Sequence, residues 1–211
     1  MGHTVGVVLG AGASTRLGRP KQTLPFGDGT LLAHVVRDVV ASSLDRVVVV
    51  VGGAASDTVA SLPSGRAEVA YNDRYGEGCA SSLLAGLDAA GSCDAIVLLL
   101  GDMPGVDAAV IDRVLGAWRR EPGWAAVTVY DDAIGHPFVF SAASFDTLRG
   151  LHGDKAVWKV VDDSPTGRVR RIHVPAPRPL DVDTWEDYLA VCDRFDVAPT
   201  LAATTKRGVG E

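Results

Sequence analysis

The stretch Gly6–Gln22, GVVLGAGASTRLGRPKQ, places a glycine-rich turn directly after a short apolar run. The apolar run is typical of a buried strand, and the bare backbone N–H groups of a glycine-rich turn after a strand can bind phosphate oxygens. Two kinds of ligand use such a turn: a dinucleotide, as in dehydrogenases, and a nucleoside triphosphate. The residues around the turn distinguish between them.

The turn departs from the dinucleotide fingerprint at two points. That fingerprint is Gly-x-Gly-x-x-Gly followed by an acidic residue about 20 residues later, and this chain has Thr15 in place of the third glycine. The next apolar run, Arg46–Val51, has no carboxylate at its end. Arg16, Arg19 and Lys21 follow the turn, and these cations suit a triphosphate. A solvated basic loop is the alternative.

Outside this stretch, short β-branched runs alternate with amphipathic stretches, which predicts an α/β protein with a mostly parallel sheet and helices on both faces. The five consecutive valines of Arg46–Val51 are typical of a strand covered on both faces. The expected strands are Val5–Leu9, Arg46–Val51, Glu68–Tyr71, Ala95–Leu100, Trp124–Tyr130, Phe138–Ser141 and Val169–Val174. The expected helices are Leu31–Ser43, Ser56–Leu62, Ser81–Ala90, Val106–Arg119, Ala142–Leu148, Lys155–Val161 and one that begins near Thr184.

The composition limits the class of protein. With 211 residues, 47% of them hydrophobic, the chain is expected to form one domain over residues 1–192 and a mobile tail over residues 193–211. A net charge of −6 argues against a nucleic-acid partner. Cys79, Cys93 and Cys192 form no zinc or disulfide pattern, so a cytoplasmic location is expected. No apolar run approaches the length of a membrane span, so no membrane partner is expected.

An aspartate follows one of the apolar runs. Asp102, in LLLGDMPGV, comes directly after Ala95–Leu100, and ligands of open α/β sheets bind at the carboxyl ends of such strands. A carboxylate at that point can hold Mg²⁺, which bridges the phosphate oxygens of a nucleotide. A helix or turn cap is the alternative for Asp102.

The segment Leu9–His34, LGAGASTRLGRPKQTLPFGDGTLLAH, resembles the signature Leu-x-Ala-Gly-x-Ser-x-Arg-Met-Gly-x-x-Lys of the MobA-like nucleotidyltransferases, most closely that of the molybdenum cofactor cytidylyltransferases. Leu17 stands in place of the usual Met, and Gly10 stands where Ala or Thr is common. The likeness runs from Val5 to about Tyr188. It implies a Rossmann-like, three-layer α/β/α sandwich of the nucleotide-diphospho-sugar transferase type.

The resemblance also implies roles for individual residues. Arg16, Lys21 and Asp102 would be catalytic, and Asp102 and Asp183 would hold Mg²⁺. For Asp183, in PLDVDTWEDY, capping of the next helix is the alternative, and Asp181 is expected to fix the loop. The implied nucleotide-binding residues are Leu9, Gly10, Ala11, Gly12, Ser14, Arg16, Lys21, Asn72, Ser82 and Asp102.

The stretch Tyr71–Leu87, YNDRYGEGCASSLLAGL, matches the glycine loop and helix start of the same family. Asn72 would contact the base or the ribose, and Ser81 or Ser82 would donate a hydrogen bond to phosphate. Helix capping is the alternative for one of the two serines.

The acceptor side departs from the family pattern. GHPFVF and HGDKAVWK match elements that border the second substrate in relatives, which implies His136, Pro137 and Lys155 as acceptor-binding residues. A buried structural histidine and a surface salt bridge are the alternatives. Relatives continue with Gly and, two residues later, Arg, where this chain has Ala156 and Trp158. Trp158 is expected in the core, with stacking on a planar substrate as the alternative.

The resemblance therefore predicts a Mg²⁺-dependent nucleotidyltransferase that joins CMP from CTP, or another NTP, to the phosphate of a molybdopterin-type cofactor and releases pyrophosphate. CTP is favoured over GTP because the turn reads Gly-Ala-Gly-Ala-Ser, as in the cytidylyltransferases. A molybdenum enzyme that receives the product is a candidate partner. Two alternatives stay open: an NAD(P)H-dependent oxidoreductase of the nicotine blue oxidoreductase type, and a cofactor chaperone that binds nucleotide without turnover.

Overall fold

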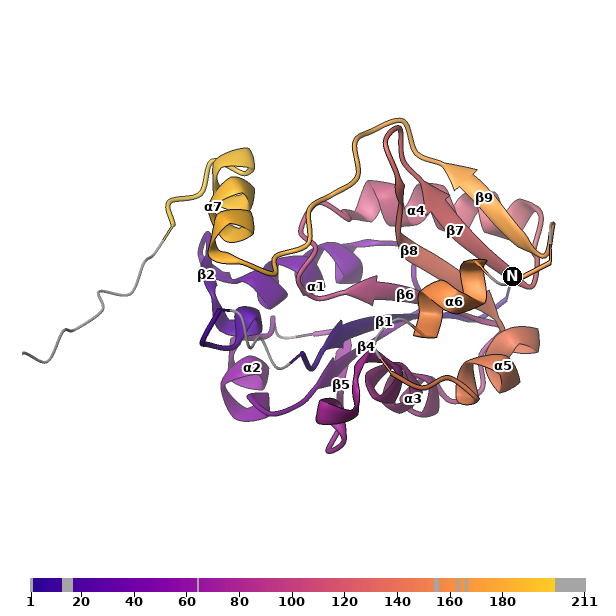
Figure 1. The fold of residues 1–211 in the computed structure, drawn as a ribbon, viewed down its shortest axis with the longest axis horizontal. Coiled ribbons are helices and arrows are strands. Elements are labelled where there is room, and N and C mark those ends of the chain that lie inside the picture. Colours follow the sequence, from indigo (N-terminus) through magenta and orange to yellow (C-terminus); the bar gives the residue numbers. More distant parts are fainter. Residues whose placement is uncertain are drawn as a thin grey trace, which may run out of the picture.

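The structure, a computed structural model, describes residues 2–12, 17–63, 65–153, 156–162, 164–165 and 167–199. Over these residues the main strands are β1 Thr4–Gly10, β4 Arg46–Val51, β5 Ala67–Tyr71, β6 Ala95–Leu100, β7 Ala125–Val129, β8 Ile134–Ser141 and β9 Val169–His173, and a small hairpin contains β2 Pro25–Phe26 and β3 Gly29–Thr30. The main strands form one sheet with the order β5-β4-β1-β6-β8-β7-β9 (Figure 1). Only β8 runs antiparallel to its neighbours among these described strands, which confirms the mostly parallel sheet.

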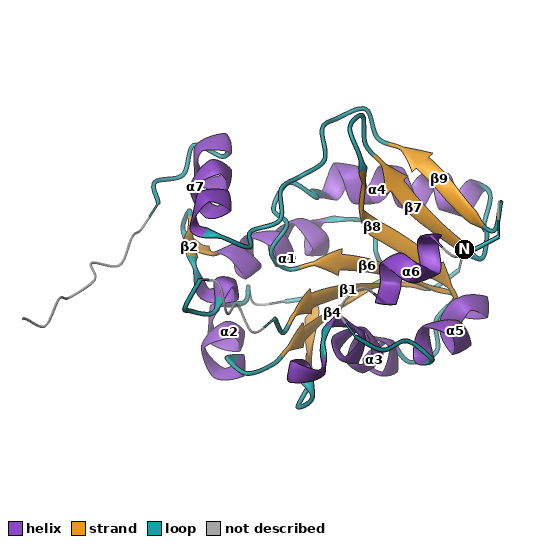
Figure 2. Ribbon diagram, viewed as in Figure 1, coloured by secondary structure: helices purple, strands orange, loops and turns teal. Residues whose placement is uncertain are grey.

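Helices cover both faces of this sheet (Figure 2). Over the described residues they are α1 Leu31–Ala41, α2 Ala55–Ser61, α3 Cys79–Ala90, α4 Ala108–Arg120, α5 Phe145–Arg149, α6 Ala156–Asp162 and α7 Trp185–Arg194, with short 3-10 helices at Lys21–Thr23, Tyr75–Glu77 and Ala142–Ser144. In β4, Val47 and Val49 pack in the cluster with α1 and α4, whereas Val48 and Val50 pack in the cluster with α3, α5 and α6. Alternate side chains of a strand point to opposite faces, so both faces of β4 are buried, as the valine run predicts. The expected three-layer α/β/α fold is confirmed.

α2 and α6 begin within one residue of the predicted starts, α5 begins at Phe145 because Ala142–Ser144 forms a 3-10 helix, and α3 and α4 each begin two residues from the predicted start. α4 starts after Asp107 because this residue is its N-cap, with a carboxylate that accepts a hydrogen bond from Val110 N. α3 starts earlier than predicted because its N-cap is Gly78, whose φ of 100° breaks the preceding chain direction. Ser81 and Ser82 therefore lie inside the first turn of α3 and do not cap it.

The C-terminal helix α7 lies beside β2, at the opposite end of the sheet from the marked N-terminus (Figure 1). The helix begins near Thr184, as the sequence predicts, and Thr184 is its N-cap and forms a capping box with Asp187. Phe195 and Val197 pack on the cluster that contains the buried side of α7, so ordered packing extends beyond the expected domain end at residue 192. The part of the expected tail over residues 200–211 lies outside the described residues.

Within the described ranges, no helix combines the length and the apolar character needed to cross a membrane.

Candidate functional site

A cavity of about 530 Å³ lies at the carboxyl ends of β1 and β6. These strands pair in parallel with Leu9 opposite Leu100, so the turns that follow them emerge side by side. Gly101 allows this close approach: its N–H donates to Leu9 O at 2.9 Å, and a Cβ there would lie 2.5 Å from Leu32 Cδ1. The lining residues are Leu9, Gly10, Ala11, Gly12, Lys21, Gln22, Tyr75, Gly76, Glu77, Gly78, Cys79, Ser82, Leu100, Gly101 and Asp102.

The cavity brings together most of the expected nucleotide-binding residues that the structure describes. Those that line it are Leu9, Gly10, Ala11, Gly12, Lys21, Ser82 and Asp102. Ser14 and Arg16 lie outside the described residues. The turn after β1, the segment after β6 and the start of α3 therefore all contribute to the lining of the cavity.

Asn72 is placed differently from the expectation. It is buried, its Nδ2 donates to Ser81 Oγ and Ser82 Oγ at 2.9 and 3.0 Å, and its Oδ1 accepts from Arg74 N at 3.0 Å. These bonds engage both ends of the amide, and Asn72 is not one of the lining residues of the cavity. Asn72 therefore fixes the start of α3, and the structure gives no support to a contact between Asn72 and a base.

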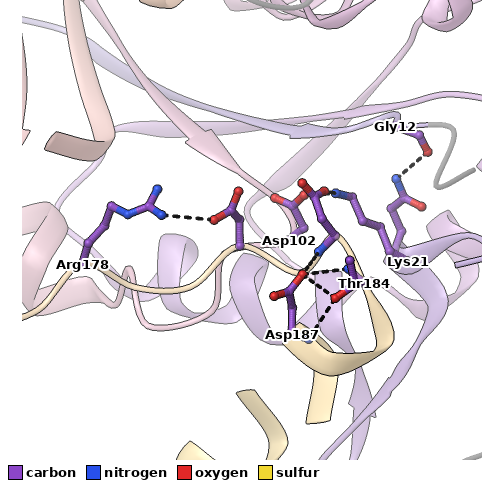
Figure 3. A network of polar contacts seen from close by, with 9 residues as sticks. Gly12, Lys21, Asp102, Arg178, Thr184 and Asp187 are labelled. Atoms are coloured by element: carbon purple, nitrogen blue, oxygen red, sulfur yellow. Dashed lines mark hydrogen bonds and ion pairs between the residues drawn. The ribbon is translucent and has the colours of Figure 1, made fainter. Parts of the chain in front are cut away.

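Lys21 lies between two carboxylates from distant parts of the chain (Figure 3). Its Nζ contacts the carboxylate of Asp102 and lies 2.8 Å from Asp183 Oδ1. Lys21 opens a short 3-10 helix, Asp102 follows β6, and Asp183 precedes α7. Val182 N donates to the backbone oxygen of Asp102 at 2.9 Å, which ties the two acidic segments together. The two residues expected to hold a metal thus meet around one ammonium group.

Burial and charge determine the electrostatics of this cluster. The side chains of Lys21 and Asp102 are 14% and 16% exposed, and that of Asp183 is 45% exposed. Burial acts to lower the pKa of Lys21, but the two carboxylates outweigh it and hold this pKa above its ordinary value. Burial raises the pKa of Asp102; Lys21 opposes this effect, and the nearby charges of Asp181 and Asp183 add to it. The carboxylate of Asp102 would therefore gain from a further cation.

Asp102 and Asp183 supply carboxylate oxygens, which are suitable ligands for a small, hard divalent cation. Carboxylate oxygens suit Mg²⁺ and Mn²⁺, and Mg²⁺ is usually held by one or two carboxylates together with waters and substrate phosphates. In the part of the chain that the structure describes, no group of three or more His, Cys, Asp or Glu side chains is arranged to hold a metal. A cation at this point would therefore complete its coordination with waters or with oxygens of a bound substrate, in addition to the two carboxylates.

His136, expected at the acceptor side, is a buried and neutral residue. It is 4% exposed, its Nδ1 lies 3.2 Å from Leu98 O, and its ring stacks on Phe138 with 4.2 Å between centroids. Burial lowers its pKa to about 4, so the ring carries no charge near neutral pH that could bind a phosphate. Pro137 follows it within β8, and Lys155 lies outside the described residues.

Trp158 is a residue of α6 and packs against the apolar cluster between this helix and the sheet. Its ring meets Phe138 edge to face with 5.1 Å between centroids, and it packs on the cluster that contains Val157 and Val160. This is the core position expected from the sequence. Stacking of Trp158 on a substrate ring therefore gains no support from the structure.

Gln22 and Tyr75 line the cavity although the sequence analysis did not single them out. Gln22 is 4% exposed; its Nε2 donates to Gly12 O at 2.9 Å, and its Oε1 is buried with no hydrogen-bond partner among the residues that the structure describes. Tyr75 lies against the turn after β4, where a Cβ on Gly53 would come within 2.6 Å of the tyrosine ring. Two features of the sequence could have indicated these residues. Gln22 directly follows Lys21, and the paired glycines after β4, Gly52 and Gly53, allow an aromatic ring such as that of Tyr75 to approach the backbone closely.

Comparison with known proteins gives a family match over most of the chain. Residues 6–169 match the family described as MobA-like NTP transferase domain. Nicotine blue oxidoreductase from Paenarthrobacter nicotinovorans is 32% identical over 145 residues, which cover 65% of this chain and 70% of that protein.

Solved structures resemble the whole fold. The homologue of Mycobacterium tuberculosis Rv0371c from Mycobacterium sp. strain JC1 is 40% identical, with a TM-score of 0.83, and the match covers 90% of this chain and 96% of that one. Rv0371c from M. tuberculosis H37Rv in complex with manganese is 37% identical, with a TM-score of 0.77, and covers 90% of this chain and 98% of that one. Nucleotidyltransferases also share the fold, which is of the nucleotide-diphospho-sugar transferase type.

Proposed function

The chain belongs to the MobA-like NTP transferase family, and from this premise we propose that it transfers a nucleotidyl group from CTP to the phosphate of a molybdopterin-type cofactor. The observation that carries the proposal is the meeting of Lys21, Asp102 and Asp183 beside a cavity walled by the glycine-rich turn after β1. Family and fold support nucleotidyl transfer as such. The choice of CTP and of the acceptor rests on the resemblance of the turn to that of the cytidylyltransferases.

Each part of the cavity has a task under this proposal. The turn that contains Gly10 and Gly12 holds phosphate oxygens through backbone N–H groups. Lys21 stabilises the negative charge that grows on the leaving pyrophosphate. Asp102 and Asp183 hold Mg²⁺, which neutralises charge on the phosphate oxygens when it is bound. A related structure was solved in complex with manganese, which supports a divalent cation as a cofactor of the proposed reaction.

The reaction needs no strong general base. An oxygen of the acceptor phosphate forms a bond to the α-phosphorus of CTP, the bond from that phosphorus to the bridging oxygen breaks, and pyrophosphate leaves with the electron pair. The attacking phosphate is already ionised near neutral pH, so no proton has to be removed from it. The rate enhancement then comes from alignment of the two phosphates and from neutralisation of their charge. The buried, neutral His136 is not needed as a base in this reaction.

Pyrophosphate release tests the proposal. The purified protein is incubated with Mg²⁺, a molybdopterin-containing extract and each of the four NTPs in turn, and release is expected with CTP. Asp102→Asn is expected to lower turnover by about 10²–10³-fold, because it removes a charge that stabilises the transition state, while the fold is retained and the protein still unfolds cooperatively. Asp193→Asn, on the exposed side of α7, is the matched control. Wild-type turnover by Asp102→Asn would remove Asp102 from the catalytic machinery.

An NAD(P)H-dependent oxidoreductase is the second candidate, because nicotine blue oxidoreductase is a relative. Thr15 in place of the third glycine and the absence of a carboxylate at the end of Arg46–Val51 in the sequence count against it. The same preparation is therefore assayed for NADPH oxidation without any NTP. NADPH oxidation with no pyrophosphate release would replace the transferase proposal, and tight CTP binding without either activity would favour a cofactor chaperone.

A further inference from the structure

The ammonium of Lys21 occupies the point where two carboxylates converge. Its Nζ contacts Asp102 and lies 2.8 Å from Asp183 Oδ1, and the side chain is 14% exposed. These are the carboxylates to which the proposed function assigns the divalent cation, and the inference rests on that function. We infer that Lys21 is the resident counter-cation of this site, so that a divalent cation binds tightly only when nucleotide phosphates draw Lys21 away.

Two cations cannot share this pair of carboxylates without strong repulsion. A divalent ion bound to both Asp102 and Asp183 would stand within a few ångströms of Nζ in its present position. At a mostly buried site this repulsion is screened less than in water. Lys21 must therefore change its position before the ion can engage both carboxylates.

A bound nucleotide gives Lys21 a second negatively charged partner. Lys21 lines the cavity, and its Cε lies 3.8 Å from the position of a Cβ on Gly12, so its stem runs beside the turn proposed to hold the phosphates. The lysine side chain is flexible and its ammonium acts as a point charge that can change partners. When Lys21 moves to the phosphates, both carboxylates become available to the metal. Nucleotide and metal therefore strengthen each other's binding, and this coupling is reciprocal.

Binding of Mn²⁺, followed by the electron paramagnetic resonance signal of the free ion, tests the inference without acceptor or turnover. Wild type, Lys21→Met and the control Lys159→Met, at an exposed position of α6, are titrated with and without CTP. Without nucleotide, Lys21→Met is expected to bind Mn²⁺ at least about tenfold more tightly than wild type. Relative to a titration of CTP alone, which also binds Mn²⁺, CTP is expected to tighten Mn²⁺ binding to the protein by about tenfold or more in wild type and by clearly less in Lys21→Met. The control should match wild type.

Equal or weaker binding of Mn²⁺ by nucleotide-free Lys21→Met would overturn the inference. If Lys21→Met shows no cooperative thermal unfolding, Lys21→Gln replaces it under the same criterion. Asp102→Asn separates this inference from the proposed function. If, in the presence of CTP, Asp102→Asn binds Mn²⁺ as tightly as wild type does, the metal site of the proposed function is wrong and the inference fails with it. If Asp102→Asn loses Mn²⁺ while Lys21→Met gains nothing, only the role of Lys21 fails.

Discussion

Gln22 shows how one side chain can shape the phosphate-binding turn. Its Nε2 donates to Gly12 O at 2.9 Å, while its Oε1 is buried and has no hydrogen-bond partner in the described part of the chain. An unpaired buried carbonyl costs about 1–3 kcal/mol, so a leucine of similar size would serve better if Gln22 only filled space. We infer that Gln22 is a positioning residue that holds the turn in its nucleotide-binding form.

Gln22→Leu is therefore expected to raise the KM for the nucleotide about 5- to 30-fold, because the hydrogen bond that holds the turn is worth about 1–2 kcal/mol. The unfolding temperature should change little, since loss of the bond to Gly12 and removal of the unpaired Oε1 act in opposite directions. Steady-state kinetics and thermal unfolding measure the two effects. Thr23→Val, which removes a hydroxyl that donates to Pro20 O in the same short helix, is the control. An unchanged KM in Gln22→Leu would show that the turn does not depend on this side chain.

Single residues differ in how far the sequence reveals their place. Lys21 and Asp102 could be predicted because a cation after a glycine-rich turn and a carboxylate after an apolar strand are informative by type and position. Asn72 and Gln22 could not, because an amide can serve a ligand or the protein itself. The choice depends on which groups come within hydrogen-bonding distance in the fold. For Asn72 these groups are the two serines of α3 and a backbone N–H.

Among the elements, α3 comes close to the sheet through a glycine. A Cβ on Gly86 would overlap Val7 Cγ1 and lie 3.0 Å from Val50 Cγ2. In α4, the nearest atom to a Cβ on Gly116 is Arg120 Nη1, at 3.8 Å. α3, which supplies Ser82 to the cavity, therefore needs glycine for its position, whereas α4 has room for a side chain.

The two glycines form a matched pair for a stability test. Gly86→Ala is expected to lower the free energy of unfolding by about 1–3 kcal/mol, because the added methyl group forces α3 away from β1 and β4. Gly116→Ala is expected to raise it by up to about 1 kcal/mol, because alanine is the better helix former and meets no obstacle. Urea unfolding measures both. Equal shifts in the two variants would contradict the close packing of α3.

The strands that carry the site could be predicted because their apolar runs are unbroken. Arg46–Val51 and Ala95–Leu100 have the bounds expected from the sequence. β8 begins earlier than the expected Phe138, because a register shift between Val127 and Thr128 restores pairing with β7 on the other side of Pro137. The two residues that the shift leaves out of the register, His136 and Pro137, lie in β8, and pairing resumes at Gly135 because β7 continues beside them, which the apolar pattern of β8 alone does not show.

On the scale of the whole molecule, the site joins Gly12, Asp102 and Asp183, which lie far apart in the sequence. The rule that parallel strands present their carboxyl ends at one edge is enough to bring the first two together. The place of Asp183 followed only from the family resemblance, since it depends on how α7 docks. Tyr188 of α7 donates its hydroxyl to Pro25 O at 2.6 Å, and this contact links α7 to the small hairpin beside the site.

The resistance of the folded molecule to acid depends in part on His136. Its folded pKa of about 4 lies below the ordinary 6.5, so the unfolded chain takes up a proton as the pH falls below 6.5 while the folded protein does not. The contribution of His136 to stability is therefore complete above pH 6.5 and is lost as the pH falls toward 4. His136→Gln keeps a donor and does not titrate. Between about pH 7 and about pH 4.5, wild type should lose about 2 kcal/mol more unfolding free energy than this variant, measured with urea. If the unfolding free energies of the two proteins fall in parallel as the pH is lowered, the pKa of His136 is the same in the folded and the unfolded protein, and the prediction is wrong.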